Sequence, residues 1–248
     1  MHYNNILEDY NKKGFAKIGN IIDKNILENL IEEIFRDDHS ISYFDNDNIL
    51  RRIEQFYNKG EALLTLNKNI LKLLYDIFSK DFVIFKDKYN AKPPGGEAFY
   101  PHYDGIFHWK NNHGEVKNGW YEYAPEFVNV LIAIDDSDSH NGTIEIAEQH
   151  NFTFDKLLLN TYKNGTPEII KKISNQLNFK KINLNKGDAV IFSHKCPHRS
   201  GENNSNISRR IIYYTYNESK FGNNYNKYFE DKFSSNPDQK IDKALSSK

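Results

Sequence analysis

The sequence predicts an α+β fold, with an all-β core flanked by helices that come first along the chain. Two observations predict it. Residues 1–80 carry apolar side chains at helical spacing, and residues 81–217 consist of short β-branched and aromatic runs separated by turn residues. Helices followed by a series of strands favour an antiparallel sandwich or barrel. With a C-terminal extension at residues 218–248, we expect a single domain of 248 residues.

The N-terminal part supplies the predicted helices. In residues 23–37 the apolar side chains recur every three or four positions, which places them on one helix face. They are Ile26, Leu27, Leu30, Ile31 and Ile34. Residues 49–67 and 69–79 repeat this periodicity, so we expect them to be helices that pack against another element.

The strands are predicted by six β-branched and aromatic runs. They are residues 81–92, 127–135, 143–149, 179–185, 189–194 and 209–217. Turn signals rich in Gly, Pro and Asn lie at residues 93–96, 140–142 and 185–188. One helical pattern, residues 166–177, interrupts the series.

Charge and composition exclude several classes of partner. The chain has 33 Lys and Arg against 34 Asp and Glu, so no strong field attracts nucleic acid or an anionic membrane. The mean hydropathy is -0.75, and no apolar run approaches the roughly 20 residues that span a bilayer. The single cysteine, Cys196, excludes an internal disulfide, and the N-terminus lacks the basic and apolar regions of a signal peptide. We therefore expect a cytoplasmic protein that binds neither nucleic acid nor membrane.

A His-x-Asp pair stands out in the segment FYPHYDGIFHW. If this segment is extended, His102 and Asp104 point the same way and Tyr103 points to the other face. Two imidazoles and one carboxylate form the three-ligand face of non-haem Fe(II) oxygenases, which leaves positions open for a co-substrate and oxygen. His198, after the apolar run DAVIFSH, is the candidate for the third ligand.

Taken alone, a His-x-Asp pair is more often a helix N-cap, a surface turn or a hydrogen-bonded couple than a metal site. The residues after His198 favour the metal site. Arg209 follows eleven positions later (209 minus 198), at the start of the next predicted strand. A guanidinium placed there can hold a dicarboxylate through two hydrogen bonds.

At this point the chain resembles the phytanoyl-CoA dioxygenase-like Fe(II)/2-oxoglutarate oxygenases, which include ectoine hydroxylase. The matching segments are residues 88–104, 130–151 and 185–217. Five features occur in the family's order: an Asn-x-Lys-Pro segment, His-x-Asp, an Asn-Gly turn, Gly-Asp before a strand, and His-x-Ser-Gly-x-Asn-x-Ser followed by Arg. The resemblance implies a double-stranded β-helix, the cupin-like jelly roll, with the N-terminal helices packed on one sheet.

The resemblance also implies the roles of individual residues. It implies that Fe(II) is bound by His102, Asp104 and His198. The 2-oxoglutarate co-substrate would be bound by Arg209 at its distal carboxylate, with help from Ser200 and Asn90. Arg210 is the competing candidate, but successive strand residues face opposite ways and the family spacing selects Arg209. Because the carboxylate ligand is present, hydroxylation or oxidative cleavage with O2 is preferred to halogenation.

Other reactive side chains are given different roles. His194 is predicted to be structural, because Pro197 and the apolar run before it argue against a helical zinc motif. His150 is read as a turn residue or a residue supporting the ligands. His108 and His113 either line the substrate entrance or lie in a solvated loop. Cys196 lacks a catalytic partner and is predicted to be a small core residue.

The residues around His102 predict a small organic substrate. Phe99, Phe107 and Trp109 would supply aromatic walls, and Lys88, which shares a strand face with Lys86, could meet an anionic group. A solvated pair of lysines is the alternative for these two. No run of Arg or Lys near His102 suits coenzyme A or an acyl carrier.

We therefore expect an Fe(II)- and 2-oxoglutarate-dependent dioxygenase that hydroxylates a small, anionic metabolite and releases succinate and CO2. The alternative is a non-catalytic jelly-roll protein that binds a metal or a small acid. The sequence leaves the substrate's identity and the oligomeric state open.

Overall fold

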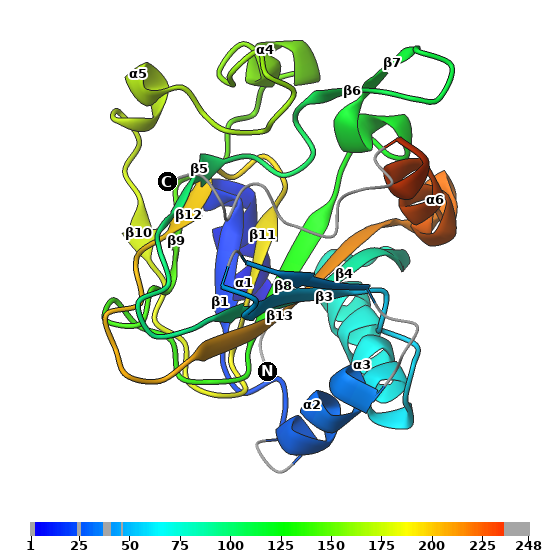
Figure 1. The fold of residues 1–248 in the computed structure, drawn as a ribbon. Helices are drawn as coiled ribbons and strands as arrows, with labels where there is room; N and C mark the ends of the chain where they lie inside the picture. The colour runs from blue at the N-terminus through cyan, green and yellow to red at the C-terminus, as the bar shows by residue number, and fades with distance from the viewer. Residues whose placement is uncertain (1–2, 24–25, 37–40, 46, 236–248) are drawn as a thin grey trace.

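The computed structural model describes residues 3–23, 26–36, 41–45 and 47–235. Its centre is a seven-stranded antiparallel sheet (Figure 1). In spatial order the strands are β1 (Phe15–Ile18), β11 (Ala189–Ser193), β8 (Val128–Ala133), β13 (Arg209–Glu218), β4 (Phe82–Lys92), β3 (Leu50–Glu54) and β2 (Ile41–Phe44). The longest pairing joins β13 to β4, which lie side by side over most of their length.

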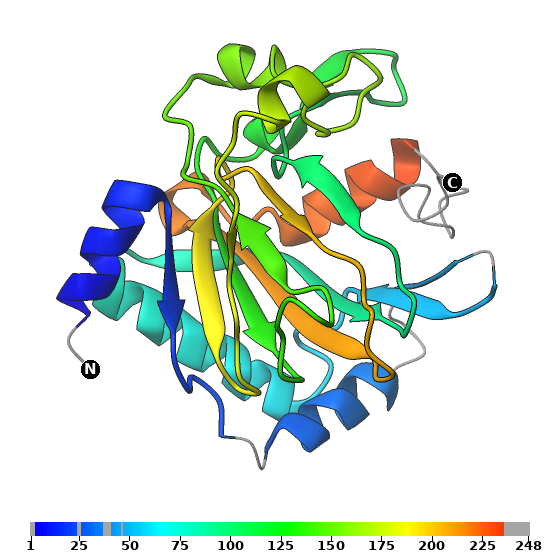
Figure 2. The same ribbon diagram turned by 90° about the vertical axis from the view of Figure 1, so that its left-hand side faces the viewer.

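A second antiparallel sheet lies beside the first (Figures 1 and 2). Its strands, in spatial order, are β10 (Lys180–Lys181), β9 (Ile144–Ile146), β12 (His198–Ser200) and β5 (Phe99–His102). A hairpin of β6 (His108–Lys110) and β7 (Val116–Asn118) leads into the 3₁₀ helix η2 (Gly119–Glu122). The two facing sheets confirm the predicted all-β core of jelly-roll type.

Alternation along the central strands divides the core into two layers. On β8, Leu131 and Ala133 belong to an apolar cluster that also contains Ile144 of the smaller sheet. Val130 and Ile132 face the opposite way and join the cluster built with the helices. A strand buried on both faces is apolar throughout, which explains why residues 127–135 lack polar alternation.

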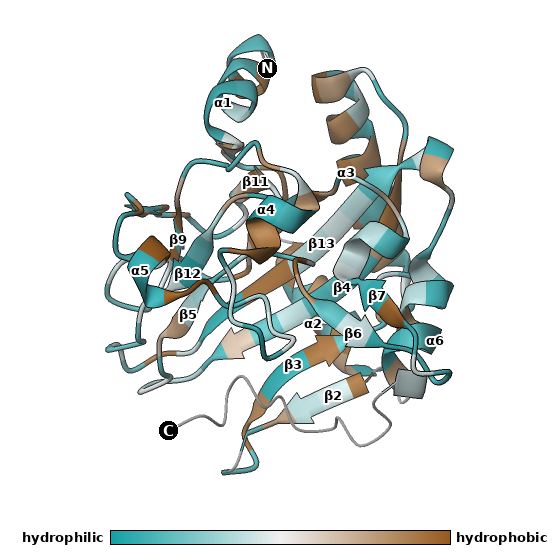
Figure 3. Cartoon of the chain, turned by 90° about the horizontal axis from the view of Figure 1, so that it is seen from above, coloured by the Kyte–Doolittle hydropathy of each residue, from teal (hydrophilic) through white to brown (hydrophobic). Residues whose placement is uncertain are grey.

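Helices cover the outer face of the large sheet. They are α1 (Asn4–Lys13), α2 (Leu27–Arg36) and α3 (Glu61–Phe78), with α6 (Tyr225–Ser235) packed beside β4. In Figure 3 apolar residues recur along α3, whereas α1 is mostly hydrophilic and has no buried residue. Two short helices, α4 (Phe154–Leu158) and α5 (Lys171–Ser174), lie in the connection between β9 and β10. Among the described residues, no helix combines the length and apolar character needed to cross a bilayer.

Three parts of the sequence prediction need correction. Residues 50–54, expected to be helical, form β3, because Arg52 and Ile53 pair with β4 and complete the sheet edge. β1 and β2 likewise add strands to the N-terminal part. The expected helix over residues 166–177 is only the single turn of α5. In each case pairing with distant strands or loops outweighs the local apolar spacing.

Candidate active site

The three predicted metal ligands meet at the edge of the smaller sheet. His102 ends β5 and His198 begins β12, and the two residues are direct partners across these strands. Asp104 follows two positions after His102, and its carboxylate lies 3.6 Å from Nε2 of His198 and 4.0 Å from Nε2 of His102. One ligand atom from each residue lies within 4.8 Å of those of the other two. The spacing suits three ligands on one face of a metal ion.

Backbone carbonyls fix the orientation of both imidazoles. Nδ1 of His102 lies 3.0 Å from the carbonyl oxygen of Tyr100, and Nδ1 of His198 lies 3.1 Å from that of Cys196. A carbonyl only accepts, so each Nδ1 carries the proton and each Nε2 keeps its lone pair for a metal. Burial and the neighbouring His198 lower the pKa of His102 to about 3, so its ring is neutral at physiological pH.

The carboxylate of Asp104 is held by a chain of hydrogen bonds. Asn129 of β8 donates from Nδ2 to Oδ2 of Asp104 at 2.8 Å, and Thr215 of β13 donates to Oδ1 of Asn129 at 2.7 Å. Burial alone would raise the pKa of Asp104, but the neighbouring side chains of His198, His102 and Lys88 lower it. The site therefore offers two neutral imidazoles and one ionised carboxylate, a donor set that fits Fe(II).

A cavity of about 470 Å³ opens beside these ligands. Strand β4 lines it with every second residue, because alternate side chains of a strand share a face. These residues are Lys86, Lys88, Asn90 and Lys92, and Ala91 also contacts the cavity. On β13 the lining residues are Arg209, Ile211 and Tyr213, which stand opposite Lys92, Asn90 and Lys88. The cavity thus has one end at Arg209 and Lys92 and another at Lys86 and Lys88.

The Arg209 end has the character of an anion site. Arg209 is 5% exposed and donates from one terminal nitrogen to the carbonyl oxygen of Gly142 at 3.0 Å. Burial lowers its pKa to about 10, which leaves it charged at neutral pH. Lys92 donates to Ser200 Oγ at 2.9 Å. Within the described chain, Nε of Arg209 and Oδ1 of Asn90 are buried without a hydrogen-bond partner.

Arg210 lies on the other face of β13. Its guanidinium makes two hydrogen bonds to the carboxylate of Asp135, at 2.7 and 2.8 Å. It does not line the cavity. The strand alternation that favoured Arg209 in the sequence therefore has its counterpart in the structure.

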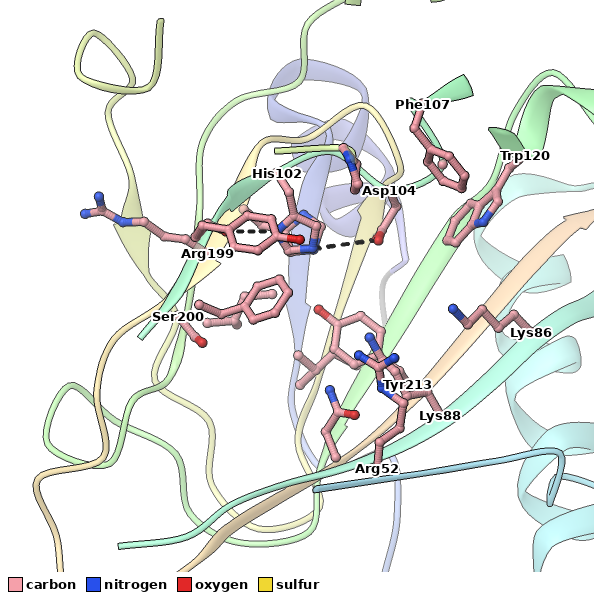
Figure 4. A pocket seen from close by; sticks show the side chains of 18 of the residues that line it. Arg52, Lys86, Lys88, His102, Asp104, Phe107, Trp120, Arg199, Ser200 and Tyr213 are labelled. Carbon is pink, nitrogen blue, oxygen red and sulfur yellow. Dashed lines mark hydrogen bonds and ion pairs between the residues drawn. The ribbon is translucent and has the colours of Figure 1, made fainter. Parts of the chain in front are cut away.

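The other end of the cavity lies across from the metal ligands. Figure 4 shows Lys88, Arg52 and Tyr213 on the side of the cavity opposite His102 and Asp104. Nζ of Lys88 lies 4.4 Å from the ring centroid of Tyr213. Burial and the nearby charges of Arg52 and Lys86 lower the pKa of Lys88 to about 7. This end of the cavity therefore favours an anionic group that would restore the full charge of Lys88.

The structure brings the predicted substrate residues to the same cavity. Phe99, Phe107, Trp109 and Lys88 all line it. His108 and His113 are exposed, and neither is among the lining residues.

The remaining candidates have structural surroundings. His194 is fully buried and its Nδ1 accepts a hydrogen bond from the backbone N–H of Phe127 at 3.1 Å. His150 Nδ1 lies 2.6 Å from the hydroxyl of Tyr103, the residue between the two ligands of the His-x-Asp pair. Cys196 is buried in the core between the sheets.

Sequence reasoning missed several residues that line the cavity or support its metal ligands. Lys92 could have been found, because it continues the alternation of Lys86, Lys88 and Asn90 along a predicted strand. Asn129 carried no signal, since an Asn inside an apolar run is visible only once its partner Asp104 is placed. Arg52 lay in a segment predicted to be helical.

A family model described as phytanoyl-CoA dioxygenase (PhyH) matches residues 10–211.

Two curated relatives cover most of the chain. A 2-aminoethylphosphonate dioxygenase from the uncultured bacterium HF130_AEPn_1 is 29% identical over 189 residues, which are 75% of this chain and 66% of the relative. A methylphosphonate hydroxylase from Gimesia maris is 25% identical over 241 residues, which are 91% of this chain and 85% of the relative. The chain thus spans slightly less than two thirds of the first relative's length.

Solved structures show the same fold at low sequence identity. The epimerase SnoN, solved in complex with Fe3+, alpha-ketoglutarate and nogalamycin RO, has a TM-score of 0.65 at 13% identity, with 88% of this chain and 84% of SnoN covered. EctD from S. alaskensis, solved with 2-oxoglutarate and 5-hydroxyectoine, has a TM-score of 0.65 at 14% identity, with 88% and 76% covered.

Proposed function

Because the chain belongs to the phytanoyl-CoA dioxygenase (PhyH) family of Fe(II)- and 2-oxoglutarate-dependent oxygenases, we propose that it hydroxylates a small anionic metabolite. One oxygen atom of O2 enters a C–H bond of the substrate. The other enters the succinate formed, with CO2, from 2-oxoglutarate. The proposal rests on one observation: a cavity that contains His102, Asp104 and His198 also contains the buried cation of Arg209.

Different residues of this chain would bind the iron and the 2-oxoglutarate. His102, Asp104 and His198 would hold the iron, which when bound supplies the site where O2 is reduced as 2-oxoglutarate is decarboxylated. Arg209 would bind the distal carboxylate of 2-oxoglutarate through two hydrogen bonds, and Ser200 would donate a further one. Asn129 would hold the Asp104 carboxylate in place beside the two imidazoles.

The substrate would lie between the metal ligands and the opposite sheet. Lys88 supports an anionic group there, and Phe99, Phe107 and Trp109 supply apolar walls. The two curated relatives are named for reactions of phosphonates, which supports a phosphonate or a similar anion for this chain as well.

A non-catalytic binding protein is the second candidate, and the structure gives it less support. A protein that only bound a metal would not need Arg209, whose buried charge lacks a carboxylate partner among the described residues. Burying such a charge is costly unless an anion meets it.

The test combines turnover with metal binding. Purified protein is incubated with Fe(II), 2-oxoglutarate and a panel of small acids that includes phosphonates, and succinate and a mass gain of one oxygen are measured. We expect both for at least one acid. The variants His102→Ala, Asp104→Ala and His198→Ala should form no succinate and, without oxygen, should lack the visible absorption band of the iron–2-oxoglutarate chelate.

His108→Ala, which changes an exposed imidazole outside the cavity, is the matched control and should behave as the wild type. If a variant of His102, Asp104 or His198 released succinate at the wild-type rate, that residue would not be a metal ligand. Metal binding without succinate formation across the panel would favour the binding protein.

A further inference from the structure

The charges of the cavity are unusually one-sided. Among the described residues that line it, eight are basic and only Asp104 and Glu97 are acidic. Asp104 is committed to the metal site. Arg51 and Arg199 pair with Asp45 and Glu145, and Arg52, Lys86 and Lys232 share Glu54. Once 2-oxoglutarate has taken Arg209, Lys88 and Lys92 are the lining cations that make no ion pair among the described residues. What they can bind depends on where Glu97 lies.

Glu97 lies at the far end from Lys88. Phe99 is the partner of Ser200 across β5 and β12, so Glu97, two residues earlier, lies beyond Ser200. Ser200 accepts a hydrogen bond from Lys92 at the Arg209 end of the cavity. Glu97 is also exposed. An ammonium group close to Lys88 would not reach it.

A second carboxylate, Glu54, lies behind the cavity and is already neutralised. It is fully buried and accepts an ion-paired hydrogen bond from Lys232, while Lys86 lies 3.6 Å from its other oxygen. It does not line the cavity. An ammonium group of the substrate would have to displace a lysine in order to pair with it.

Lys88 is the basic group that faces the metal ligands without a carboxylate of its own. Within the described chain it makes no ion pair, and its Nζ lies over the ring of Tyr213. Lys86, two residues away on the same strand face, shares Glu54 with Lys232 and Arg52, so this group of three cations and one carboxylate keeps a net positive charge near Lys88. A doubly charged anion satisfies this arrangement better than a singly charged one, and a nearby positive charge on the ligand is repelled.

We infer that the substrate is a dianionic organic acid, such as an alkylphosphonate, whose carbon chain carries no ammonium group. This inference rests on the proposed function and deepens it. Lys88 binds the dianion across from the iron, the aromatic walls contact the uncharged carbon chain, and the surplus of positive charge excludes an aminated analogue.

The test compares ligands of equal size that differ in charge. Binding is measured by calorimetry, without oxygen, to protein loaded with Fe(II) and 2-oxoglutarate. The ligands are n-propylphosphonate, 2-aminoethylphosphonate, in which an ammonium group replaces the terminal methyl group, and butyrate, which replaces the phosphonate by a carboxylate. We expect n-propylphosphonate to bind at least about tenfold more tightly than either of the others.

Two variants assign the preference to Lys88. Lys88→Gln should weaken n-propylphosphonate binding and narrow its advantage over 2-aminoethylphosphonate, whereas Lys110→Gln, an exposed residue of β6 outside the cavity, should change neither. The ligand comparison on the wild type needs no variant, so it holds even if Lys88→Gln is unstable.

Equal or tighter binding of 2-aminoethylphosphonate, or equal binding of butyrate, would overturn the inference. So would a preference left unchanged in Lys88→Gln. The proposed reaction is tested separately. If the ligands bound in the expected order but none supported succinate formation, the hydroxylase would be refuted, and the preference of the cavity for a dianion without an ammonium group would stand.

Discussion

Two adjacent arginines of β13 offer a test at the scale of single residues. Arg209 is buried in the cavity, whereas Arg210 pairs with Asp135 on the other face. Arg209→Lys keeps the charge but loses the forked pair of donors, so the affinity for 2-oxoglutarate should fall by about 1.5–3 kcal/mol, the contribution of a hydrogen bond to a charged group. Titration of 2-oxoglutarate into Fe(II)-loaded protein without oxygen measures this.

Arg210→Lys is the matched control, because it makes the same chemical change one position away. Its 2-oxoglutarate affinity should stay within the error of the wild type. If the lysine at 210 weakened binding and the lysine at 209 did not, the assignment of the two strand faces would be reversed.

The residues that sequence alone could place are those that recur in an ordered motif. His102, Asp104 and His198 were predicted together, and the structure brings them to one point because β5 and β12 pair at His102 and His198. Arg52 and Asn129 could not be predicted, since their places depend on pairings between distant strands. A local motif identifies a reactive residue, but the residues that surround it in space are set by the register of the sheet.

At the scale of elements, a glycine turn supports the co-substrate end of the cavity. Gly142 has a φ of +76°, and a Cβ there would lie 2.5 Å from the carbonyl oxygen of Gly201. Gly142→Ala would therefore combine left-handed backbone strain with displacement of the segment after β12. We expect it to lower the free energy of unfolding by about 2–5 kcal/mol and to weaken 2-oxoglutarate binding, because the Gly142 carbonyl holds Arg209.

Gly95→Ala separates the two contributions. Gly95 has a similar φ of +72°, but a Cβ there would meet nothing within 4 Å. The substitution should cost only the backbone strain, about 1–2 kcal/mol, and leave 2-oxoglutarate binding unchanged. Denaturant unfolding and calorimetry measure both quantities. Equal losses in the two variants would show that the contact with Gly201 does not matter.

The pairing of strands explains why the helix predicted over residues 49–67 was partly wrong. Residues 49–67 have apolar side chains at helical spacing, yet the first part forms β3 and only the part after Gly60 belongs to α3. β3 forms because the edge of β4 provides hydrogen-bond partners at Asn90 and Tyr89, which the local pattern cannot reveal. The apolar strands β8, β11 and β13 were predictable because burial on both faces requires a continuous apolar run.

At the scale of the whole molecule, one buried carboxylate joins three parts of the chain. Glu54 of β3 accepts hydrogen bonds from Tyr43 of β2, at 2.8 Å, and from Lys232 of α6, and it lies 3.6 Å from Lys86 of β4. Glu54→Gln would leave Lys232 and Lys86 without the carboxylate that balances their charge. We expect a loss of about 3–5 kcal/mol in the free energy of unfolding, the usual cost of breaking a buried ion pair.

The pH dependence gives this prediction a second readout. Burial alone would raise the pKa of Glu54, but Lys232, Lys86 and Arg52 lower it below its ordinary value. A lowered pKa means that the carboxylate stabilises the fold at neutral pH and that this contribution is lost as the pH falls below about 4. Glu54→Gln should therefore lose less stability than the wild type on acidification.

Asp76→Asn is the control, because it breaks a surface pair with Lys72 on α3. That pair should contribute less than about 1 kcal/mol. Chemical unfolding at neutral and acidic pH measures all three proteins. If Glu54→Gln were as stable as Asp76→Asn, the buried ion pairs of Glu54 would contribute no more to stability than the surface pair of Asp76.

The two faces of β4 have different roles, and this limits which changes of sequence the strand can accept. One face of the strand presents Lys86, Lys88 and Lys92 to the ligands, while the other buries Asp87 and Tyr89. Inserting or deleting a single residue would exchange the two faces, so selectivity and folding would be lost together. Replacing the side chains at positions 86 and 88 would change the charge that meets a ligand without moving the strand, whereas we expect an inserted or deleted residue to be tolerated only in the loops outside it.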